Sequence, residues 1–366
     1  MAKTEILGLS FEEIESVIVG LGLPRYRANQ IYHWLYKRQT HSFFGMGNIP
    51  KELRETLNAQ LSISLPKMIK ARISKDGTRK FLLELPEKKR IEVVAIPQHR
   101  HKDRRYTICL SSQVGCPLRC AFCATGQSGF ERDLTAGEIV GQLVVAEREI
   151  RKREKIAHSE KVLSNVVFMG MGEPLLNLDA VLKAIEIIND ERGIGIGQRH
   201  ITISTAGIIP GIEMLAASKL QVTLAISLHA ATDEQRSSLI PVNRRFSLEP
   251  LMEAVNDYIR KTGRRVTFEY VLIKGINDSA ADAVRLAKMV NSLLANLNLI
   301  PYNPTDVCEF QRPDQETINS FYALLKNKGV NVTFREEMGA DIEAACGQLK
   351  GRLARYKQEN DIIRPK

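Results

Sequence analysis

The stretch Cys116-Pro117-Leu118-Arg119-Cys120-Ala121-Phe122-Cys123 places three thiols at x3 and then x2 spacing. Three thiolates in so short a loop can wrap one corner of a soft-metal cluster. Three ligands are one too few for a closed zinc site, whereas a four-iron cluster held by three thiolates keeps one iron open for a substrate. The alternative is a structural zinc site completed by Cys109 or a more distant cysteine, although zinc ligands usually come as two Cys-x2-Cys pairs.

The composition is that of an ordinary globular protein. The chain has 366 residues, of which 44% are hydrophobic and 26% are charged, enough for two or three domains. No apolar run approaches the roughly 18 residues that span a membrane, and the first residues lack the pattern of a secretory signal. Six cysteines, three of them clustered, favour a reducing compartment over a disulfide scaffold. We therefore expect a cytoplasmic enzyme without membrane contact.

The net charge of +10 is concentrated in the first third of the chain. Residues 1–108 contain 20 Lys and Arg against 11 Asp and Glu, whereas residues 109–366 contain 32 against 31. A basic module joined to an electrically balanced body is typical of proteins with a polyanionic partner such as RNA. The alternative is a solvated basic surface without a partner, but the uneven distribution favours nucleic acid.

The first 65 residues predict short helices. Ser10 and Glu13 have the spacing of a capping box, and a second helix is expected over residues 25–36, after a Gly/Pro break. Arginines and aromatics on the second helix would suit nucleic-acid docking, but the same aromatics would equally well form the core of a small helical subdomain. Both interpretations stay open at this point.

A β-hairpin is expected next. From residue 67 the pattern becomes strand-like, and residues 80–85 and 90–96 flank the turn formed by residues 86–89. A basic loop over residues 98–105 then leads into the rest of the chain.

From residue 107 onward, strand-like and helix-like segments alternate. Strands are expected at residues 107–111, 162–169, 201–205, 222–228, 266–273, 297–301 and 330–334. Helices are expected behind a Thr135/Glu138 capping box and near residues 178–188, 248–261, 280–294 and 315–328. Repeated βα units imply a parallel sheet with helices outside it, closed or nearly closed, and ligands in such folds collect at the carboxyl ends of the strands.

Small and polar residues stand at those strand ends. They form the runs 170–177, 204–207, 227–230 and 301–304. Glycines in the first run let backbone approach a ligand closely, and Glu173 can receive an ammonium group. Each run is a common loop when taken alone, and His229 by itself would more often be a structural histidine. Four such ends beside the cysteine cluster predict one polar pocket.

The cysteine spacing resembles that of the radical S-adenosylmethionine (SAM) enzymes. The runs 109–135, 168–175, 204–207, 227–230 and 339–349 resemble, more specifically, the RlmN family of rRNA and tRNA adenine methyltransferases. The likeness spans residues 92–349 and weakens before residue 90. It implies an α/β fold, a partial (β/α)6 TIM-like barrel with an N-terminal helical and β-hairpin accessory domain. The expected parts are a helical RNA-binding domain (1–65), a hairpin region (66–101), the barrel (102–340) and a C-terminal segment (341–366).

The resemblance also implies the cofactors and their ligands. One [4Fe-4S] cluster would be held by Cys116, Cys120 and Cys123, and two SAM molecules would be used per turnover. The residues at SAM-binding positions would be Gly172, Glu173, Ser204, Ser227, Leu228, His229 and Asn303.

By the same resemblance, catalysis resembles ping-pong covalent transfer, because adenine carbon 2 is too electron-poor to displace a methyl group from SAM. Cys346 would accept a methyl group from the first SAM, and a radical from the second would activate that methyl group to attack the adenine. Glu92 would remove the ring proton, and Cys109 would attack Cys346 to release the product as a disulfide forms. A static Cys109–Cys346 disulfide is the alternative, which a reducing cytoplasm disfavours. Cys308 has no matching role.

The residues around Glu92 allow two interpretations of their own. Both faces of residues 91–96 are apolar, so the carboxylate should be partly desolvated, which suits a general base. The pattern alone would favour an exposed carboxylate at a sheet edge, because Glu is rarely buried, and the family match reverses that preference.

The expected partners are 23S rRNA, tRNA with an adenosine in its anticodon loop, and a flavodoxin-like or ferredoxin-like electron donor, with the protein itself a monomer. Two rival functions remain. One is methylation of adenine carbon 8, which confers antibiotic resistance, and the other is a non-catalytic, metal-bearing RNA-binding protein.

Overall fold

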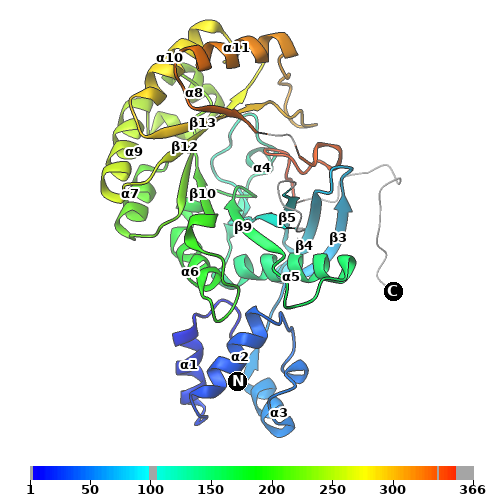
Figure 1. The fold of residues 1–366 in the computed structure, drawn as a ribbon. Helices are drawn as coiled ribbons and strands as arrows, with labels where there is room; N and C mark the ends of the chain where they lie inside the picture. The colour runs from blue at the N-terminus through cyan, green and yellow to red at the C-terminus, as the bar shows by residue number, and fades with distance from the viewer. Residues whose placement is uncertain (1–2, 99–104, 336–337, 352–366) are drawn as a thin grey trace.

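The computed structural model describes residues 3–98, 105–335 and 338–351, and it consists of a small helical N-terminal domain attached to a large α/β core (Figure 1). Most of the expected basic loop at residues 98–105, and the end of the chain after residue 351, lie outside the described residues. Within the described residues, no helix combines the length and the apolar character needed to cross a membrane.

The N-terminal domain contains the expected helices. Its elements are β1 (Thr4–Glu5), α1 (Phe11–Gly20), α2 (Tyr26–Tyr36), α3 (Lys51–Gln60) and β2 (Leu61–Ser62), and β1 pairs with β2 in parallel. The predicted capping box of α1 is present, because Ser10 N donates to Glu13 Oε2 at 2.8 Å and Glu13 N donates to Ser10 Oγ at 3.4 Å. On α2, Tyr32 and Tyr36 are fully buried and form the domain core, whereas Tyr26 is exposed. The core interpretation therefore holds for two of the α2 aromatics.

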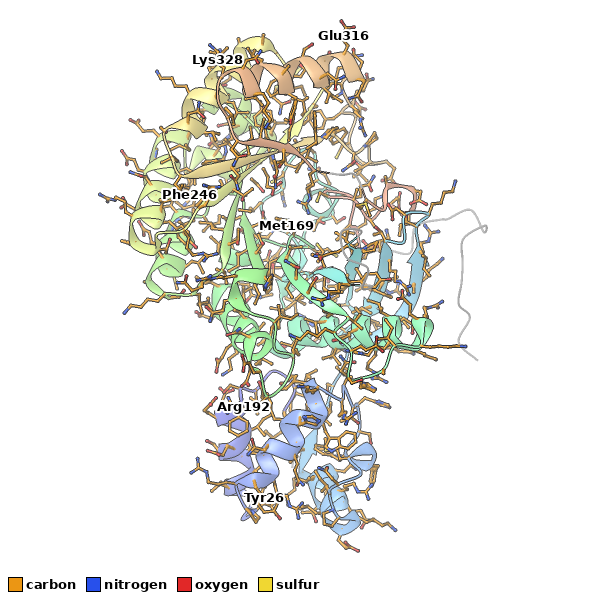
Figure 2. The ribbon with its side chains drawn as sticks, viewed as in Figure 1. Tyr26, Met169, Arg192, Phe246, Glu316 and Lys328 are labelled. Atoms are coloured by element: carbon orange, nitrogen blue, oxygen red, sulfur yellow. The ribbon has the colours of Figure 1, made fainter. Side chains whose placement is uncertain are left out.

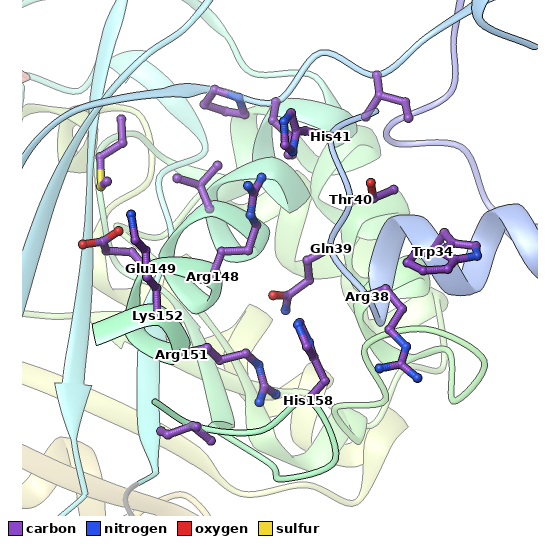
Figure 3. A pocket seen from close by; sticks show the side chains of 16 residues that line it. Trp34, Arg38, Gln39, Thr40, His41, Arg148, Glu149, Arg151, Lys152 and His158 are labelled. Carbon is purple, nitrogen blue, oxygen red and sulfur yellow. The ribbon is translucent and has the colours of Figure 1, made fainter. Parts of the chain in front are cut away.

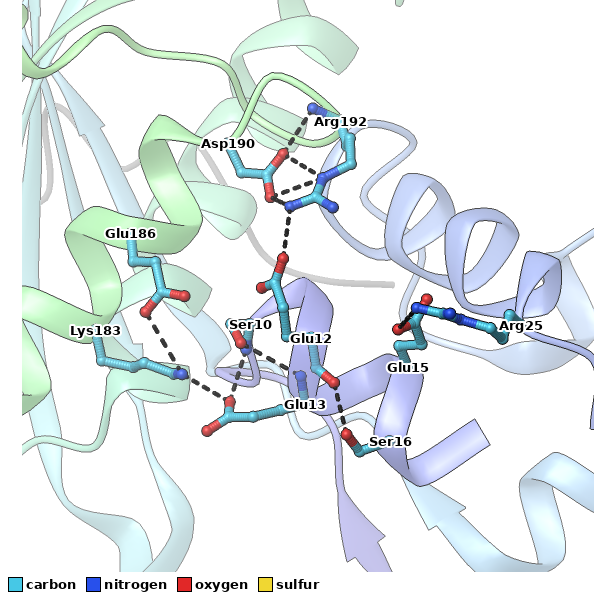
Figure 4. Close-up of polar contacts among 10 residues, drawn as sticks. All are labelled: Ser10, Glu12, Glu13, Glu15, Ser16, Arg25, Lys183, Glu186, Asp190 and Arg192. Carbon is cyan, nitrogen blue, oxygen red and sulfur yellow. Dashed lines mark hydrogen bonds and ion pairs between the residues drawn. The ribbon is translucent and has the colours of Figure 1, made fainter. Parts of the chain in front are cut away.

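The N-terminal domain is fixed to the core by ion pairs and by close backbone packing. Figure 4 shows Glu13 of α1 against Lys183 of α6 (Leu178–Asn189), at 2.8 Å, and Glu12 against Arg192, at 3.3 Å. A Cβ on Gly137 of α5 (Ala136–Glu154) would lie 2.3 Å from the Leu7 carbonyl oxygen, so only glycine allows this approach. Arg192 marks the junction in Figure 2.

One ten-stranded sheet organises the core, in the order β14-β13-β12-β11-β10-β9-β6-β5-β4-β3. Its parallel part runs from β6 to β14, as expected from the βα repeats, and its strands follow each other in space in the order of the sequence. The parallel strands are β6 (Tyr106–Cys109), β9 (Leu163–Phe168), β10 (Ile201–Thr205), β11 (Thr223–Ser227), β12 (Val266–Leu272), β13 (Ala295–Pro301) and β14 (Val332–Phe334).

Helices cover the outer side of this curved sheet (Figure 1). Besides α5 and α6 they are α7 (Ile209–Ala217), α8 (Asp233–Leu239), α9 (Leu248–Thr262), α10 (Ala280–Asn291) and α11 (Gln315–Asn327). The sequence pattern did not indicate α7 and α8. Of these, α7 is apolar along most of its length, so it lacks the polar face on which an amphipathic pattern depends.

The hairpin region is part of the same sheet. Strands β3 (Lys67–Ile73), β4 (Arg79–Glu84) and β5 (Arg90–Pro97) pair in antiparallel fashion, each with its neighbour, and β5 pairs with β6 at Val94–Cys109 and Ala95–Ile108. The predicted hairpin is confirmed, and it extends the barrel sheet by three strands. Deleting residues 1–108 would therefore remove β3 to β6, so contributions to RNA binding have to be tested with point variants.

Candidate active site

The three clustered cysteines lie in the loop between β7 (Gln113–Gly115) and β8 (Phe130–Asp133), which pair with each other. Cys116 N donates to the Gly129 carbonyl at 2.9 Å, and Cys123 is the N-cap residue of the short helix α4 (Ala124–Gln127). Gly115 has φ 77°, and a Cβ there would lie 1.9 Å from the Gly129 oxygen, so this turn requires glycine. The backbone thus folds the loop so that all three thiols line one cavity.

The loop offers three soft donors. Within the described part of the chain, no three His, Cys, Asp or Glu side chains converge closely enough to surround one metal ion. Burial raises the pKa of the Cys116 thiol to about 12 and also raises the pKa of Cys120 and Cys123. A soft cation bound by these thiols would displace their protons, as at other metal-binding cysteines.

The cavity beside the loop has a volume of about 150 Å³ and is closed by the carboxyl ends of the parallel strands. Of the predicted site residues, the structure brings together Cys116, Cys120, Cys123, Gly172, Glu173, Ser204, Ser227, His229, Asn303 and Cys346 along its wall. Met169, which follows β9, also lines it and lies near the centre of the molecule (Figure 2). Leu228 does not line the cavity, since its side chain is fully buried in the core behind it.

Glu173 is a buried carboxylate held in a fixed orientation. Its oxygens accept hydrogen bonds from Leu175 N at 3.0 Å and from Ala206 N at 2.8 Å. Burial raises the pKa of Glu173 to about 7, so a cationic ligand in the cavity would stabilise the ionised form. The preceding Gly172 has φ 105°, and a Cβ there would approach Gln113 Cβ to 2.6 Å. Glycine is therefore needed for the turn that delivers Glu173.

His229 is a neutral hydrogen-bonding group. Its Nδ1 accepts from Val271 N at 3.0 Å, so the ring hydrogen resides on Nε2. Burial, with a contribution from the nearby Arg236, lowers the pKa of His229 to about 3. The residue has φ 57° and stacks edge-on against Phe122 of the cluster loop, with ring centroids 4.9 Å apart. The strained backbone is compensated by these contacts, which fix the ring at the cavity wall.

Two further polar residues, Arg236 behind the cavity wall and Asn303 in it, shape this site. Arg236, which the sequence motifs did not indicate, donates to the carbonyl oxygens of Ala206 at 2.6 Å, Ser227 at 3.1 Å and Leu228 at 3.1 Å, so it ties together the ends of β10 and β11. Asn303 Oδ1 is buried and has no hydrogen-bond partner among the described residues. A buried acceptor without a partner is costly, so this oxygen indicates a polar ligand in the cavity.

Cys346 lies between this cavity and a second one. The second cavity, of about 390 Å³, is lined by Cys109, Val94, Phe334 and Ala345 among others, and the two cavities share Cys346, Asn303 and Arg335. The segment carrying Cys346 is bound to the cluster loop, because Ala124 N donates to the Gly347 carbonyl at 2.8 Å. Cys109 and Cys346 are both free thiols. Cys308 is also a free thiol, on the loop after β13.

Arg335 is a second functional candidate that the motifs missed. Its Nη1 lies 3.2 Å from Met169 Sδ and 3.7 Å from Glu269 Oε2. The Cys346 sulfur is the main group that raises the pKa of this guanidinium, followed by Glu269 and Cys109. By contrast, burial raises the pKa of Cys109 to about 12, and a charge on Cys346 adds to that effect. Arg335 and Cys346 both line the two cavities, so the guanidinium places a positive charge on the wall that carries the Cys346 sulfur.

Glu92 is buried but reaches neither cavity. It lies on β5, on the face that also carries Val94 and Ile96 at the second cavity. Its Oε2 accepts from Lys350 N at 2.7 Å and from Gly351 N at 3.3 Å, and its Oε1 lies 3.3 Å from Lys80 Nζ. The expected desolvation is confirmed, since Glu92 is 2% exposed. The C-terminal segment covers the carboxylate.

Sequence and structure comparisons agree with this geometry. Residues 110–287 match the model of the radical SAM superfamily, and residues 4–63 match that of the ribosomal RNA large subunit methyltransferase N-terminal domain. The chain is 51% identical to a probable dual-specificity RNA methyltransferase RlmN from Syntrophomonas wolfei, over 95% of this chain and 97% of that protein. A protein described by the same words from Thermotoga maritima is 47% identical, over 97% and 99%. The crystal structure of a radical SAM methyltransferase from Sphaerobacter thermophilus superposes with a TM-score of 0.90 at 43% identity, over 95% of this chain and all of that one.

Proposed function

Because this chain belongs to the RlmN family of radical SAM RNA methyltransferases, we propose that it methylates carbon 2 of an adenosine in 23S rRNA and in the tRNA anticodon loop. The observation that carries the proposal is the position of Cys346, which stands between the cavity beside the cysteine loop and a second cavity that also contains Cys109. A methyl carrier needs access to a methyl donor on one side and to the RNA base on the other. We place the reaction in the cytoplasm, with a monomeric enzyme and a flavodoxin-like or ferredoxin-like donor.

In this proposal the cavity beside the cysteine loop holds the cofactors. Cys116, Cys120 and Cys123 would bind one [4Fe-4S] cluster, and Glu173 would receive the SAM ammonium group. Asn303 Oδ1, which has no partner among the described residues, would accept a hydrogen bond from SAM. Backbone N–H and C=O groups around Gly172 and Ser204 would form further hydrogen bonds with SAM. Once bound, the cluster supplies the electron that cleaves SAM and so the radical that activates the methyl group on Cys346.

The chain's own residues carry the covalent steps. The Cys346 sulfur forms a bond to the methyl carbon of the first SAM as the sulfonium–methyl bond breaks, and Arg335, which lines the same cavities, would supply a positive charge near that sulfur. After the activated carbon has bonded to adenine, the adduct gives up one electron, which the cluster would accept, and the ring proton passes to Glu92. The Cys109 sulfur, having lost its proton, then bonds to the Cys346 sulfur as the sulfur–carbon bond breaks. The electron pair of that bond stays on the methylene carbon, which takes up a proton to become the methyl group, so methylated RNA and a disulfide remain. Because burial holds the pKa of Cys109 at about 12, this thiol stays unreactive until then.

Glu92 needs a local movement before it can act. In the structure its Oε2 is occupied by the backbone N–H groups of Lys350 and Gly351. We propose that binding of RNA at the second cavity displaces this segment and exposes the carboxylate beside Val94. Lys80, which is 5% exposed and lies 3.3 Å from Glu92, would then keep the carboxylate oriented.

Glu92→Gln is expected to lower product formation about 10²- to 10⁴-fold, the usual contribution of a positioned base. The methyl carrier and the radical step stay intact, so the methylene-bridged RNA–protein adduct should accumulate. Stability should also fall by about 3–5 kcal/mol, because the buried Lys80 charge loses the Glu92 carboxylate and keeps the Glu343 carbonyl as an acceptor. Denaturing gels report the adduct and thermal melts report stability, with the exposed Glu87→Gln of the same hairpin as the matched control. Normal turnover in Glu92→Gln would show that Glu92 does not accept the ring proton.

Arg335→Gln is expected to slow methylation of Cys346 roughly ten- to hundredfold, the range for losing one charge-assisted contact. The direct measurement is the rate at which iodoacetamide alkylates Cys346 in a Cys109→Ser background, because that rate follows the thiolate fraction. Arg335→Lys should restore part of the rate, since the positive charge returns. Equal alkylation rates in Arg335→Gln and the parent would show that Arg335 does not activate Cys346.

The site of methylation is tested directly by mass spectrometry of nucleosides from treated RNA. We expect 2-methyladenosine in both rRNA and tRNA substrates. 8-Methyladenosine would overturn the carbon 2 assignment in favour of the sister reaction, and unmodified RNA from a brown, SAM-cleaving protein would overturn the proposed function itself.

A further inference from the structure

A large cleft lies outside the proposed active site, where the N-terminal domain meets the core. Its volume is about 840 Å³, and it is lined by α2 and the segment after it on one side and by α5 and the loop after it on the other. Figure 3 shows Arg38, Gln39 and His41 facing Arg148, Arg151, Lys152 and His158. The cleft is therefore built from two domains, and its wall is predominantly basic.

Several of these cations have no carboxylate partner. Among the residues that the structure describes, Arg38, Arg148 and Lys152 make no ion pair, whereas Arg151 pairs with Glu147 and Arg153 with Glu149. Arg148 is half-buried, and the removal of its guanidinium from water lowers its pKa. His158 has a lowered pKa from burial and from the charges of Arg151 and Arg38. Like charges gathered in a concave wall repel each other, and an anion in the cleft would relieve that repulsion.

Gln39 adds a second and different signal. Its side chain is 3% exposed, and its Oε1 has no hydrogen-bond partner among the described residues. A buried acceptor that lines a basic cleft would be satisfied by a hydroxyl donor of the ligand.

We propose that this cleft binds the RNA substrate away from the reacting base, with Arg148 and Arg38 on backbone phosphates and Gln39 Oε1 on a ribose 2′-hydroxyl. Phosphate contacts explain the basic wall, and the hydroxyl contact would let the protein distinguish RNA from DNA. The inference rests on the proposed function for its ligand. It extends the expectation that the basic residues 1–108 dock the RNA, because α5 would supply one of the two phosphate contacts.

The size of the cleft also favours RNA over a protein partner. An acidic protein partner would need a broad surface, because stable protein–protein interfaces bury roughly 1,200–2,000 Å² in total. A concave cleft instead suits a narrow polyanionic chain that runs along the cleft. One side of the cleft also comes from residues 34–68, within the part of the chain that carries most of the net positive charge.

The test measures RNA binding by the full-length, cluster-loaded protein across a salt series, with an unmodified rRNA fragment as the probe. Arg148→Gln is expected to weaken binding about tenfold and to lower the magnitude of the salt slope by about one. Arg260→Gln on α9 removes one exposed charge outside the cleft lining, so it should change neither the RNA affinity nor the salt slope. Gln39→Leu should weaken RNA binding while leaving binding of the matching DNA unchanged.

The outcomes separate this inference from the proposed function. SAM cleavage in the absence of RNA should be the same in Arg148→Gln and the parent, so a loss of cleavage would indicate damage to the fold. An unchanged salt slope in Arg148→Gln would overturn the inference while leaving the methyltransferase assignment intact. If flavodoxin reduced Arg148→Gln more slowly than the parent while RNA affinity stayed the same, the inference would also be overturned, because the cleft would then dock a protein. If Gln39→Leu weakened the binding of RNA and of DNA equally, Gln39 would not contact the 2′-hydroxyl.

Discussion

Cys109→Ala should accumulate a covalent RNA–protein complex, and Cys346→Ala should form none. Cys346 lies between the two cavities, and in the proposed mechanism its sulfur bonds first to the methyl group and then, through that carbon, to the adenine. Cys109 is buried on β6 and acts only when the sulfur–carbon bond has to break. Loss of Cys109 therefore leaves the adduct in place, whereas loss of Cys346 prevents the first bond. Both variants should release no methylated RNA.

The measurement is a denaturing gel of each variant after anaerobic incubation with SAM, reductant and substrate RNA. Cys308→Ala serves as the matched control, because it removes a free thiol of the same region that has no proposed role, and it should turn over normally. An adduct with Cys346→Ala would reverse the two roles. Two adduct-free variants with the same loss of thermal stability would instead indicate that the cysteines serve the fold.

Cys123→Ala should abolish reductive cleavage of SAM and lower the iron content from about four per chain. Cys123 is one of only three proposed protein ligands, so its loss leaves two thiolates, too few to hold a cluster with a defined open iron. The residue also caps α4, the helix whose first backbone N–H donates to Gly347 beside Cys346, so the local structure has to be checked as well. Deoxyadenosine release and iron analysis report the two effects.

Cys123→Ser provides the check on folding, because serine is close to cysteine in size and is a favourable residue at a helix N-cap. It should melt like the parent before the cluster is installed and still cleave no SAM. Normal cleavage with a full complement of iron in either variant would refute the ligand assignment. A colourless protein carrying one zinc would support the structural-metal alternative.

Local sequence patterns were sufficient for most of the secondary structure. The Ser10/Glu13 and Thr135/Glu138 capping boxes both form, because the side chain and the backbone N–H groups that make them are only three residues apart. The parallel strands lie within a few residues of their predicted positions, since each is a short apolar run bounded by polar residues. The motif spacing also predicted which residues would meet at one cavity, because strand ends of a βα sheet lie at one edge.

Other features arise only when distant segments meet. The sequence placed Leu228 among the ligand residues, but its side chain points into the core, because the turn into His229 presents the next side chain to the cavity instead. Arg335 and Arg236 carried no recognisable motif, and each acquires a role through partners on other strands. Arg148 and Arg38 form one basic cleft although 110 residues separate them in the chain.

The sequence by itself therefore determined most of the elements, the cysteine loop and the family, since all three depend on residue types at short, fixed spacings. Only the tertiary structure decided that β3 to β5 extend the barrel sheet, that the segment around Lys350 covers Glu92, and that Cys346 stands between two cavities. These relations are set by strand register and by the closure of long loops. Both depend on the packing of the whole core, so no local pattern in the sequence encodes them.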